Sequence, residues 1–231
     1  SRPKRMKMIK DELLEMKKKY GDERRPEIVL SAEEFNIEDL VAEEDMVISI
    51  SHAGYIKRIP VSAYRRQRRG GRGVTGMTTK EEDFVEHMFI ASTHSYILFL
   101  TNKGRCHWLK VYDIPQGGRA SRGRSVVNIL EVETDETIAA IVPVKAFDDQ
   151  HFLVQCTKLG LIKKTPLSAY SNPRKGGIIA LNIVDGDALI EAALTDGTQD
   201  ILISTKLGQA VRFQEAEVRE GGRNAQGVRG I

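Results

Sequence analysis

The most chemically distinctive residues of the chain lie in the stretch 64–76, YRRQRRGGRGVTG. Five arginines fall within eight positions of it, at 65, 66, 68, 69 and 72, and glycines stand at 70, 71, 73 and 76. An arginine guanidinium is planar and suits phosphate oxygens, while glycine lets the backbone turn and come close to a ligand. The stretch therefore predicts a cationic loop that binds phosphate groups, with an ordinary solvated turn as the alternative.

Charge is unevenly spread along the 231 residues. The net charge is only +3, but residues 46–127 hold fourteen basic and five acidic side chains, whereas residues 26–45 hold eight acidic side chains and no basic one. A locally positive field attracts a polyanionic partner and steers its approach. The distribution indicates a surface for a polyanion, and a merely solubilising charged face is the other interpretation.

Other classes of function find little support in the sequence. No apolar run approaches the roughly 18 to 20 residues of a membrane helix, and the basic N-terminus lacks the apolar core of a signal peptide. Cys106 and Cys156 lie in apolar runs, which favours buried thiols in a reducing compartment. No GxxxxGK[ST], HExxH or CxxC motif occurs. We therefore expect a cytoplasmic protein with no catalytic residues, no metal and no cofactor in this chain.

Residues 1–20 predict an amphipathic helix. Met6, Ile9, Leu13, Met16 and Tyr20 recur at spacings of three and four, which places them on one helical face. This face is expected to pack against an upstream domain, as the tail of that domain. The acidic and largely aperiodic residues 21–45 are expected to form a linker or edge segment.

From residue 46 the sequence repeats with a period of about 50 residues. Each unit has a β-rich apolar run, a polar turn with glycine and a second short apolar run, and units start near 46, 96, 151 and 199. Short β-branched runs bounded by glycine predict strands, and four strands in a unit of this length predict a propeller blade. We expect an all-β, propeller-like domain over residues 46–231 that stops within its fourth repeat.

Basic residues recur at matching positions of these units, three and four residues after the turn glycine and again shortly before a second glycine. Matching positions of successive blades lie on the same face, so these side chains should trace a basic rim. The rim residues are Lys57, Arg58, Arg65, Arg66, Lys103, Arg105, Lys110, Arg119, Arg122, Arg124, Lys163, Lys164, Arg174 and Lys175.

A resemblance to a known family rests on the same stretch. Gln67, Arg68, Arg69, Gly70, Gly71, Arg72 and Gly73 spell QRRGGRG, which resembles the seven-residue box of the C-terminal domain of the DNA gyrase A protein. The phrases SHAGYIKRIPVSAY, KLGLIKKTPLSAY and DERRPEI resemble that family as well, and the similarity covers essentially residues 20–231.

The resemblance implies a β-pinwheel, a spiral of blades that exchange hairpins. It also implies non-specific binding and wrapping of duplex DNA around the rim with a fixed hand, with the box residues 67–73 as part of the DNA-binding site. The partners it implies are duplex DNA, the gyrase B protein and a second gyrase A protein, in a type II topoisomerase that introduces negative supercoils. ATP and magnesium would be used elsewhere in that enzyme, and the isolated chain is expected to be monomeric and away from membranes.

Two alternatives stay open. The first is the equivalent domain of topoisomerase IV, in which the box is typically absent or degraded, so the intact QRRGGRG disfavours it. The second is a propeller that binds proteins, for which the basic rim would be incidental. The family domain usually has about six blades, so three and a half repeats predict a truncated or shortened domain.

Overall fold

The computed structural model describes residues 2–22, 37–64, 76–79 and 83–231. The chain divides into two units, residues 1–39 and residues 40–231. In the first unit, helix α1 (Arg2–Tyr20) forms where the apolar spacing predicts it, and it buries none of its residues. Three lysines fill its last turn, where positive charge favours the negative end of the helix dipole. A 3-10 turn, η1 (Ile37–Leu40), follows in the acidic segment.

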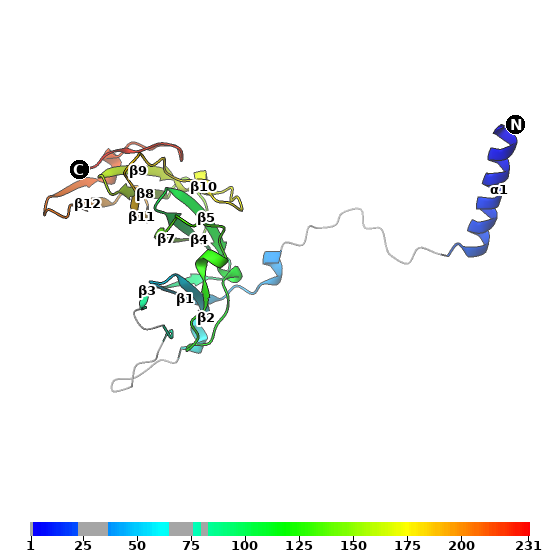
Figure 1. The fold of residues 1–231 in the computed structure, drawn as a ribbon, viewed down its shortest axis with the longest axis horizontal. Helices are drawn as coiled ribbons and strands as arrows, with labels where there is room; N and C mark the ends of the chain where they lie inside the picture. The colour runs from blue at the N-terminus through cyan, green and yellow to red at the C-terminus, as the bar shows by residue number, and fades with distance from the viewer. Residues whose placement is uncertain (1, 23–36, 65–75, 80–82) are drawn as a thin grey trace. The chain divides into compact units, whose positions relative to one another are not determined.

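The second unit consists of four antiparallel sheets that follow one another along the chain (Figure 1). The first has the order β3 (Val85–Ser92), β1 (Asp45–Ser51), β2 (Tyr55–Pro60), β6 (Arg124–Ser125). The second has the order β7 (Ile138–Val144), β4 (Tyr96–Thr101), β5 (Arg105–Lys110), β10 (Ile178–Ile179). The third has the order β11 (Leu189–Thr195), β8 (Phe152–Thr157), β9 (Leu161–Pro166), β14 (Val228–Arg229). The fourth is the hairpin β12 (Asp200–Ser204) and β13 (Ala210–Gln214).

The sheets are linked by exchanged strands. β6, β10 and β14 each come from the repeat that follows the sheet they join, and they pair with β2, β5 and β9 respectively. The pairing falls at the same place each time, with Arg124 opposite Ile56, Ile178 opposite Cys106 and Val228 opposite Ile162. The predicted all-β, propeller-like fold is confirmed.

Short 3-10 turns follow the hairpins of the sheets. They are η2 (Val61–Ala63), η3 (Val111–Asp113), η5 (Leu167–Tyr170) and η6 (Glu215–Glu217), one after the second central strand of each repeat, and η4 (Val126–Asn128) follows β6.

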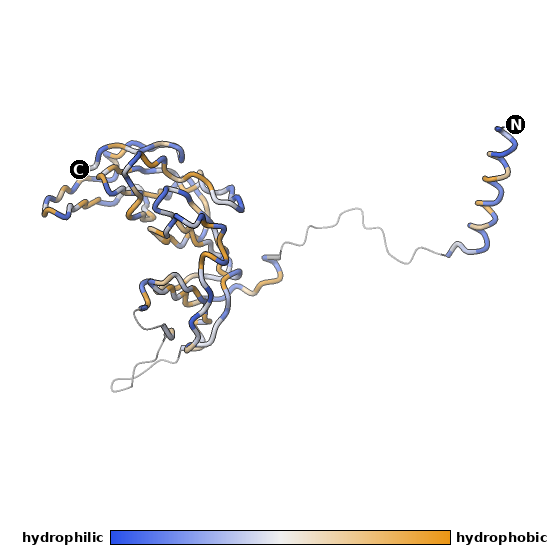
Figure 2. Tube along the Cα trace, in the orientation of Figure 1, coloured by the Kyte–Doolittle hydropathy of each residue, from blue (hydrophilic) through white to orange (hydrophobic). Residues whose placement is uncertain are grey.

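The hydrophobic core lies between successive sheets. On β4, Ile97 and Phe99 belong to a cluster with Ile48 of the first sheet, whereas Leu98 and Leu100 belong to a cluster with residues of the third sheet. Alternate side chains of a strand point to opposite faces of its sheet. A strand whose sheet packs against another sheet on each face is therefore apolar at every position. This arrangement explains the continuous run ILFL at 97–100, and Figure 2 shows apolar residues along the central strands.

Candidate nucleic-acid interface

Three loops lead into the exchanged strands, and we call residues 115–123, 171–177 and 219–227 the exchange loops. Each begins after the 3-10 turn of one repeat and ends at the short strand that joins the preceding sheet. The first lies along β2, where the amide of Gly117 donates to the carbonyl oxygen of Arg58 at 3.1 Å. The third lies along β9, where the amide of Gly221 donates to the carbonyl of Lys164 at 2.8 Å. The exchange loops therefore occupy equivalent places on successive sheets.

Exposed arginines lie on the first two exchange loops and at the start of β6. Arg119 and Arg174 lie in the loops, Arg124 begins β6, and all three are exposed. Within the part of the chain that the structure describes, no carboxylate forms an ion pair with them. Their guanidinium groups can thus take phosphate oxygens as partners without breaking a described ion pair.

The third exchange loop adds an arginine that the sequence prediction omitted. Arg219 is exposed at the beginning of this loop, at the position that Pro115 holds in the first. Arg223 is half-buried, and one guanidinium nitrogen donates to the carbonyl of Ile179 at 3.3 Å. The recurrence of Gly-Gly-Arg at 117–119 and 221–223 is the sequence signal that marks both loops.

Two predicted rim lysines are exposed but already paired with carboxylates. Lys175 contacts Glu131 at 2.9 Å, and Lys103 forms an ion pair with Asp135. The carboxylate partner raises the pKa of each lysine. Water and salt screen exposed ion pairs of this kind, so a phosphate group can compete for these lysines.

Four predicted rim residues are half-buried, and their side chains contact other groups of the protein. The Nε of Arg58 donates to the carbonyl of Ile114 at 2.6 Å, and the Nζ of Lys110 donates to that of His94 at 2.9 Å. The guanidinium of Arg122 lies 5.4 Å from the centre of the Tyr55 ring. Arg105 lies 3.9 Å from Glu136 and donates to the carbonyl of Gly176.

Three of the predicted rim lysines are inside the protein, and the expectation of an exposed position is corrected for them. The exposed fractions are 0% for Lys57, 2% for Lys163 and 5% for Lys164. Lys57 and Lys163 donate to backbone carbonyls, and Lys164 pairs with the fully buried Glu215 at 3.4 Å. Their ammonium groups point into the protein, so these lysines offer no charge to a surface ligand.

The arginine-rich stretch itself lies outside the described residues. This applies to Arg65, Arg66 and the box residues Gln67, Arg68, Arg69, Gly70, Gly71, Arg72 and Gly73. Their expected role in binding phosphate groups stays a prediction.

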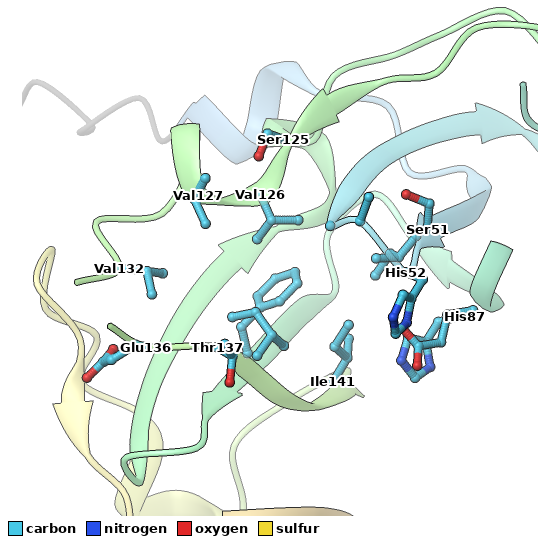
Figure 3. Close-up of a pocket in the computed structure, with 16 residues that line it drawn as sticks. Ser51, His52, His87, Ser125, Val126, Val127, Val132, Glu136, Thr137 and Ile141 are labelled. Carbon is cyan, nitrogen blue, oxygen red and sulfur yellow. The ribbon is translucent and has the colours of Figure 1, made fainter. Parts of the chain in front are cut away.

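A pocket between the first two sheets offers a second place for a ligand. Figure 3 shows Glu136 at one end of it and His52 and His87 at the other, with Val126 and Ile141 between them. Glu136 is 6% exposed, and neither of its carboxylate oxygens has a hydrogen-bond partner among the described residues. Burial raises the pKa of this carboxyl group. The mainly apolar walls and a single buried acid do not form a site for an anion.

The described residues hold no group of three or more His, Cys, Asp or Glu side chains placed to bind a metal ion. Both cysteines are free thiols, Cys106 buried and Cys156 half-buried. Over the same described residues, no helix is both long enough and apolar enough to cross a membrane.

Comparison with known families agrees with the repeat structure. A family model described as "DNA gyrase C-terminal domain, beta-propeller" matches the chain four times in succession, over residues 45–92, 95–145, 152–196 and 199–231.

Curated relatives are similar over almost the whole chain. The DNA gyrase A protein of Clostridium acetobutylicum is 53% identical over 223 residues, which are 96% of this chain and 27% of that protein. The DNA gyrase A protein of Haemophilus influenzae is 46% identical over 226 residues, which are 98% of this chain and 26% of that protein. The chain thus spans about a quarter of the length of these relatives.

Two solved structures resemble the fold. The C-terminal domain of DNA topoisomerase IV matches with a TM-score of 0.70 and 28% identity, covering 82% of this chain and 57% of that one. A DNA gyrase A C-terminal domain matches with a TM-score of 0.63 and 23% identity, covering 81% of this chain and 60% of that one.

Proposed function

Because this chain belongs to the family of the DNA gyrase C-terminal domain, a beta-propeller, we propose that it binds duplex DNA without sequence preference and wraps it with a fixed hand. The wrap follows the exchange loops of successive sheets and includes the stretch at residues 65–73. In the complete enzyme, which combines two gyrase A proteins with the gyrase B protein in the cytoplasm, the wrap makes ATP-dependent strand passage introduce negative supercoils. The chain itself supplies no catalytic residue and no cofactor.

The observation that carries the proposal is the repetition of cationic exchange loops. Arg119, Arg174 and Arg219 are exposed on three loops that stand at equivalent places on three successive sheets. Phosphates recur along a duplex regardless of its sequence, so a repeated cationic contact suits the backbone better than the bases. Bending a duplex by 40 to 90° costs roughly 1 to 6 kcal/mol, which several phosphate contacts can offset.

The alternative of a protein-binding propeller makes a different prediction about salt. Each phosphate contact that releases a counterion adds about 0.9 to the slope of log affinity against log salt concentration. We expect a steep slope for the unmodified chain on duplex DNA of unrelated sequences. A flat slope would exclude wrapping through phosphates and favour the protein-binding alternative.

The exposed arginines of the exchange loops are tested by a triple variant with Arg119, Arg174 and Arg219 changed to alanine. The slope should fall by about 2 to 3, because three phosphate contacts are lost. The matched control changes the exposed Lys145, Lys158 and Lys206 to alanine, which removes the same charge outside the exchange loops and β6. Equal losses in the two triple variants would show that net charge, and not the exchange loops, governs binding.

Wrapping is tested separately from binding by DNA topology. The chain is bound to relaxed circular DNA, the circle is nicked and closed, and the linking number is measured after the protein is removed. We expect a change of one sign that grows with protein concentration and disappears in the arginine triple variant. Tight binding without any change of linking number would exclude a chiral wrap while leaving DNA binding intact.

A further inference from the structure

Two fully buried lysines hold the first and third exchange loops. Lys57 and Lys163 stand at the same position of β2 and β9, three residues after the turn glycines Gly54 and Gly160. They are 0% and 2% exposed, and among the described carboxylates none pairs with either ammonium group. A buried charge without a counter-ion needs other polar partners. The groups around these lysines must therefore supply hydrogen-bond acceptors for the ammonium groups.

The partners of Lys57 are backbone carbonyls of the following repeat. The Nζ of Lys57 donates to the carbonyl oxygens of Gly118 at 2.9 Å, Arg119 at 2.7 Å and Ser121 at 2.8 Å. An ammonium group has three hydrogens, so these three acceptors satisfy it completely. The loop turns around the ammonium group of the preceding sheet.

The third exchange loop repeats the arrangement. The Nζ of Lys163 donates to the carbonyl oxygens of Arg223 at 2.6 Å and Gly222 at 3.4 Å, and to that of Ala180. In both loops one acceptor is the carbonyl of the arginine that follows two glycines, Arg119 in one and Arg223 in the other. The same contact is thus built twice, about 106 residues apart, by the repeat geometry.

The loop backbone also lies directly on the lysine side chain. A Cβ on Gly117 would stand 3.4 Å from the Cδ of Lys57, and one on Gly123 would stand 3.0 Å from its Cβ. A Cβ on Gly227 would stand 3.2 Å from the Cβ of Lys163. The tightest contacts of a Cβ on Gly123 and Gly227 would be with the carbonyl oxygens of Ile56 and Ile162, at 2.3 and 2.6 Å, so glycine at these positions lets the loop ends lie against β2 and β9 beside the lysines.

The second exchange loop is held differently. His107 occupies the lysine position on β5 and is buried, and the loop is two residues shorter, so that a Cβ on Gly177 would stand 2.8 Å from the His107 ring. Arg105 donates to the carbonyl of Gly176 in place of an ammonium contact. The buried lysine thus occurs with the Gly-Gly-Arg loops.

We propose that Lys57 and Lys163 are positioning residues for DNA binding, which hold the Gly-Gly-Arg loops so that their carbonyls face the protein and their outer side faces the phosphates. This inference rests on the proposed function. Carbonyl oxygens carry negative partial charge, and a loop that exposed them would repel phosphates. By binding carbonyls of the loop, the ammonium group leaves the outer side of the loop for the DNA, with the exposed Arg119 on the first exchange loop and the exposed Arg219 on the third.

The test replaces each lysine with methionine, singly and together, in the whole chain. Methionine keeps much of the apolar stem but has no hydrogen to donate. Lys206→Met removes an exposed lysine of the β12–β13 turn as the charge-matched control. Lys57→Gln is a second variant that keeps a shorter donor, for use if Lys57→Met fails to fold.

Two measurements are made on each variant, at a pH below about 7, the value to which burial lowers the pKa of Lys163, so that its amine is an ammonium group. Hydrogen exchange should become at least tenfold faster at the loop amides of Gly117 and Ser121 in Lys57→Met, while the amides of β1 and β4 keep their protection. The salt slope of DNA binding should fall by about one for each lysine replaced and stay unchanged in Lys206→Met. Lys57→Gln should lie between the unmodified chain and Lys57→Met in both measurements.

The outcomes separate this inference from the proposed function. Unchanged exchange at the loop amides would overturn it, because the lysines would not hold the loops. Faster exchange with an unchanged salt slope would also overturn it, because the held loops would not matter for DNA. A flat slope in the unmodified chain would refute both the proposed function and the positioning role. This outcome is distinct from the other two because it is measured on the chain without any substitution.

Discussion

Replacing Gly123 with alanine should destabilise the second unit strongly. Gly123 has a φ of +84°, and a Cβ there would lie 2.3 Å from the carbonyl oxygen of Ile56. The left-handed conformation costs a residue with a side chain about 1–2 kcal/mol. Relieving the overlap requires a backbone shift that costs a further ~1–3 kcal/mol. We expect the free energy of unfolding to fall by roughly 2–5 kcal/mol, a large share of the 5–15 kcal/mol typical of a folded protein.

Gly118 provides a control within the same exchange loop. A Cβ on Gly118 would meet no atom within 4 Å, and its backbone is not left-handed. Alanine there reduces the freedom of the unfolded chain, so stability should change little or rise by up to about 1 kcal/mol. The third exchange loop offers a second pair, because Gly227 has a φ of +93° and a Cβ on it would lie 2.6 Å from the Ile162 carbonyl oxygen, whereas Gly222 is open.

The assay is urea and thermal unfolding followed by circular dichroism, with calorimetry to test for a single transition. In a unit of this size a loss of 1 kcal/mol lowers Tm by about 2–4 °C. Gly123→Ala and Gly227→Ala should each lower Tm clearly, and Gly118→Ala and Gly222→Ala should not. If Gly123→Ala unfolded within about 0.5 kcal/mol of the unmodified chain, the loop would not be pressed against β2 as described.

Three further predictions concern the core and a buried charge. Leu98→Ala should cost about 2–5 kcal/mol in urea unfolding because Leu98 is fully buried between two sheets, whereas Leu202→Ala, at a position 69% exposed, should cost less than about 0.5 kcal/mol. Trp108→Phe should cost about 1 kcal/mol in the same assay, since it removes the hydrogen bond from Trp108 Nε1 to the carbonyl of Tyr170 at 3.0 Å. Burial, with the charge of Arg223 nearby, lowers the pKa of Lys163 from 10.5 to about 7. Between these values the unfolded chain binds more protons than the folded one, so Lys163 should make stability rise with pH from about 7 to 10.5, and Lys163→Met should lack that rise in unfolding measured across this range.

The blades could be predicted because their signals are local. The run VISIS at 47–51 alternates, the run ILFL at 97–100 is apolar throughout, and each hairpin turn carries a glycine. The strands β1 and β4 contain these runs, and β2 and β5 begin directly after the turn glycines Gly54 and Gly104. The exchanged strands are only two residues long, so no periodicity marks them, and the family resemblance was the only indication of exchange.

The position of the buried lysines could not be predicted, because their partners are distant and have no side-chain signature. A lysine on a strand usually faces solvent, and Lys57 is buried only because the backbone of residues 118–121 folds over it. Lys164 is likewise explained by Glu215, a residue 51 positions later in the chain. The equal spacing of Gly104 to Gly123 and of Gly208 to Gly227 reflects this packing, but in the sequence it has the appearance of a turn pattern alone.

Each exchanged strand is synthesised after the sheet that it joins, and this order affects the chain as it leaves the ribosome. The central strands of the first sheet end at Pro60, but β6, which covers the edge of β2, is made only when Arg124 and Ser125 have been synthesised. Until then β2 presents an open edge that can pair with another nascent chain. Each later repeat repeats this interval, since β5 waits for β10 and β9 waits for β14. Slow translation through residues 61–125 would therefore prolong the period in which neighbouring polypeptides on one messenger can misassemble.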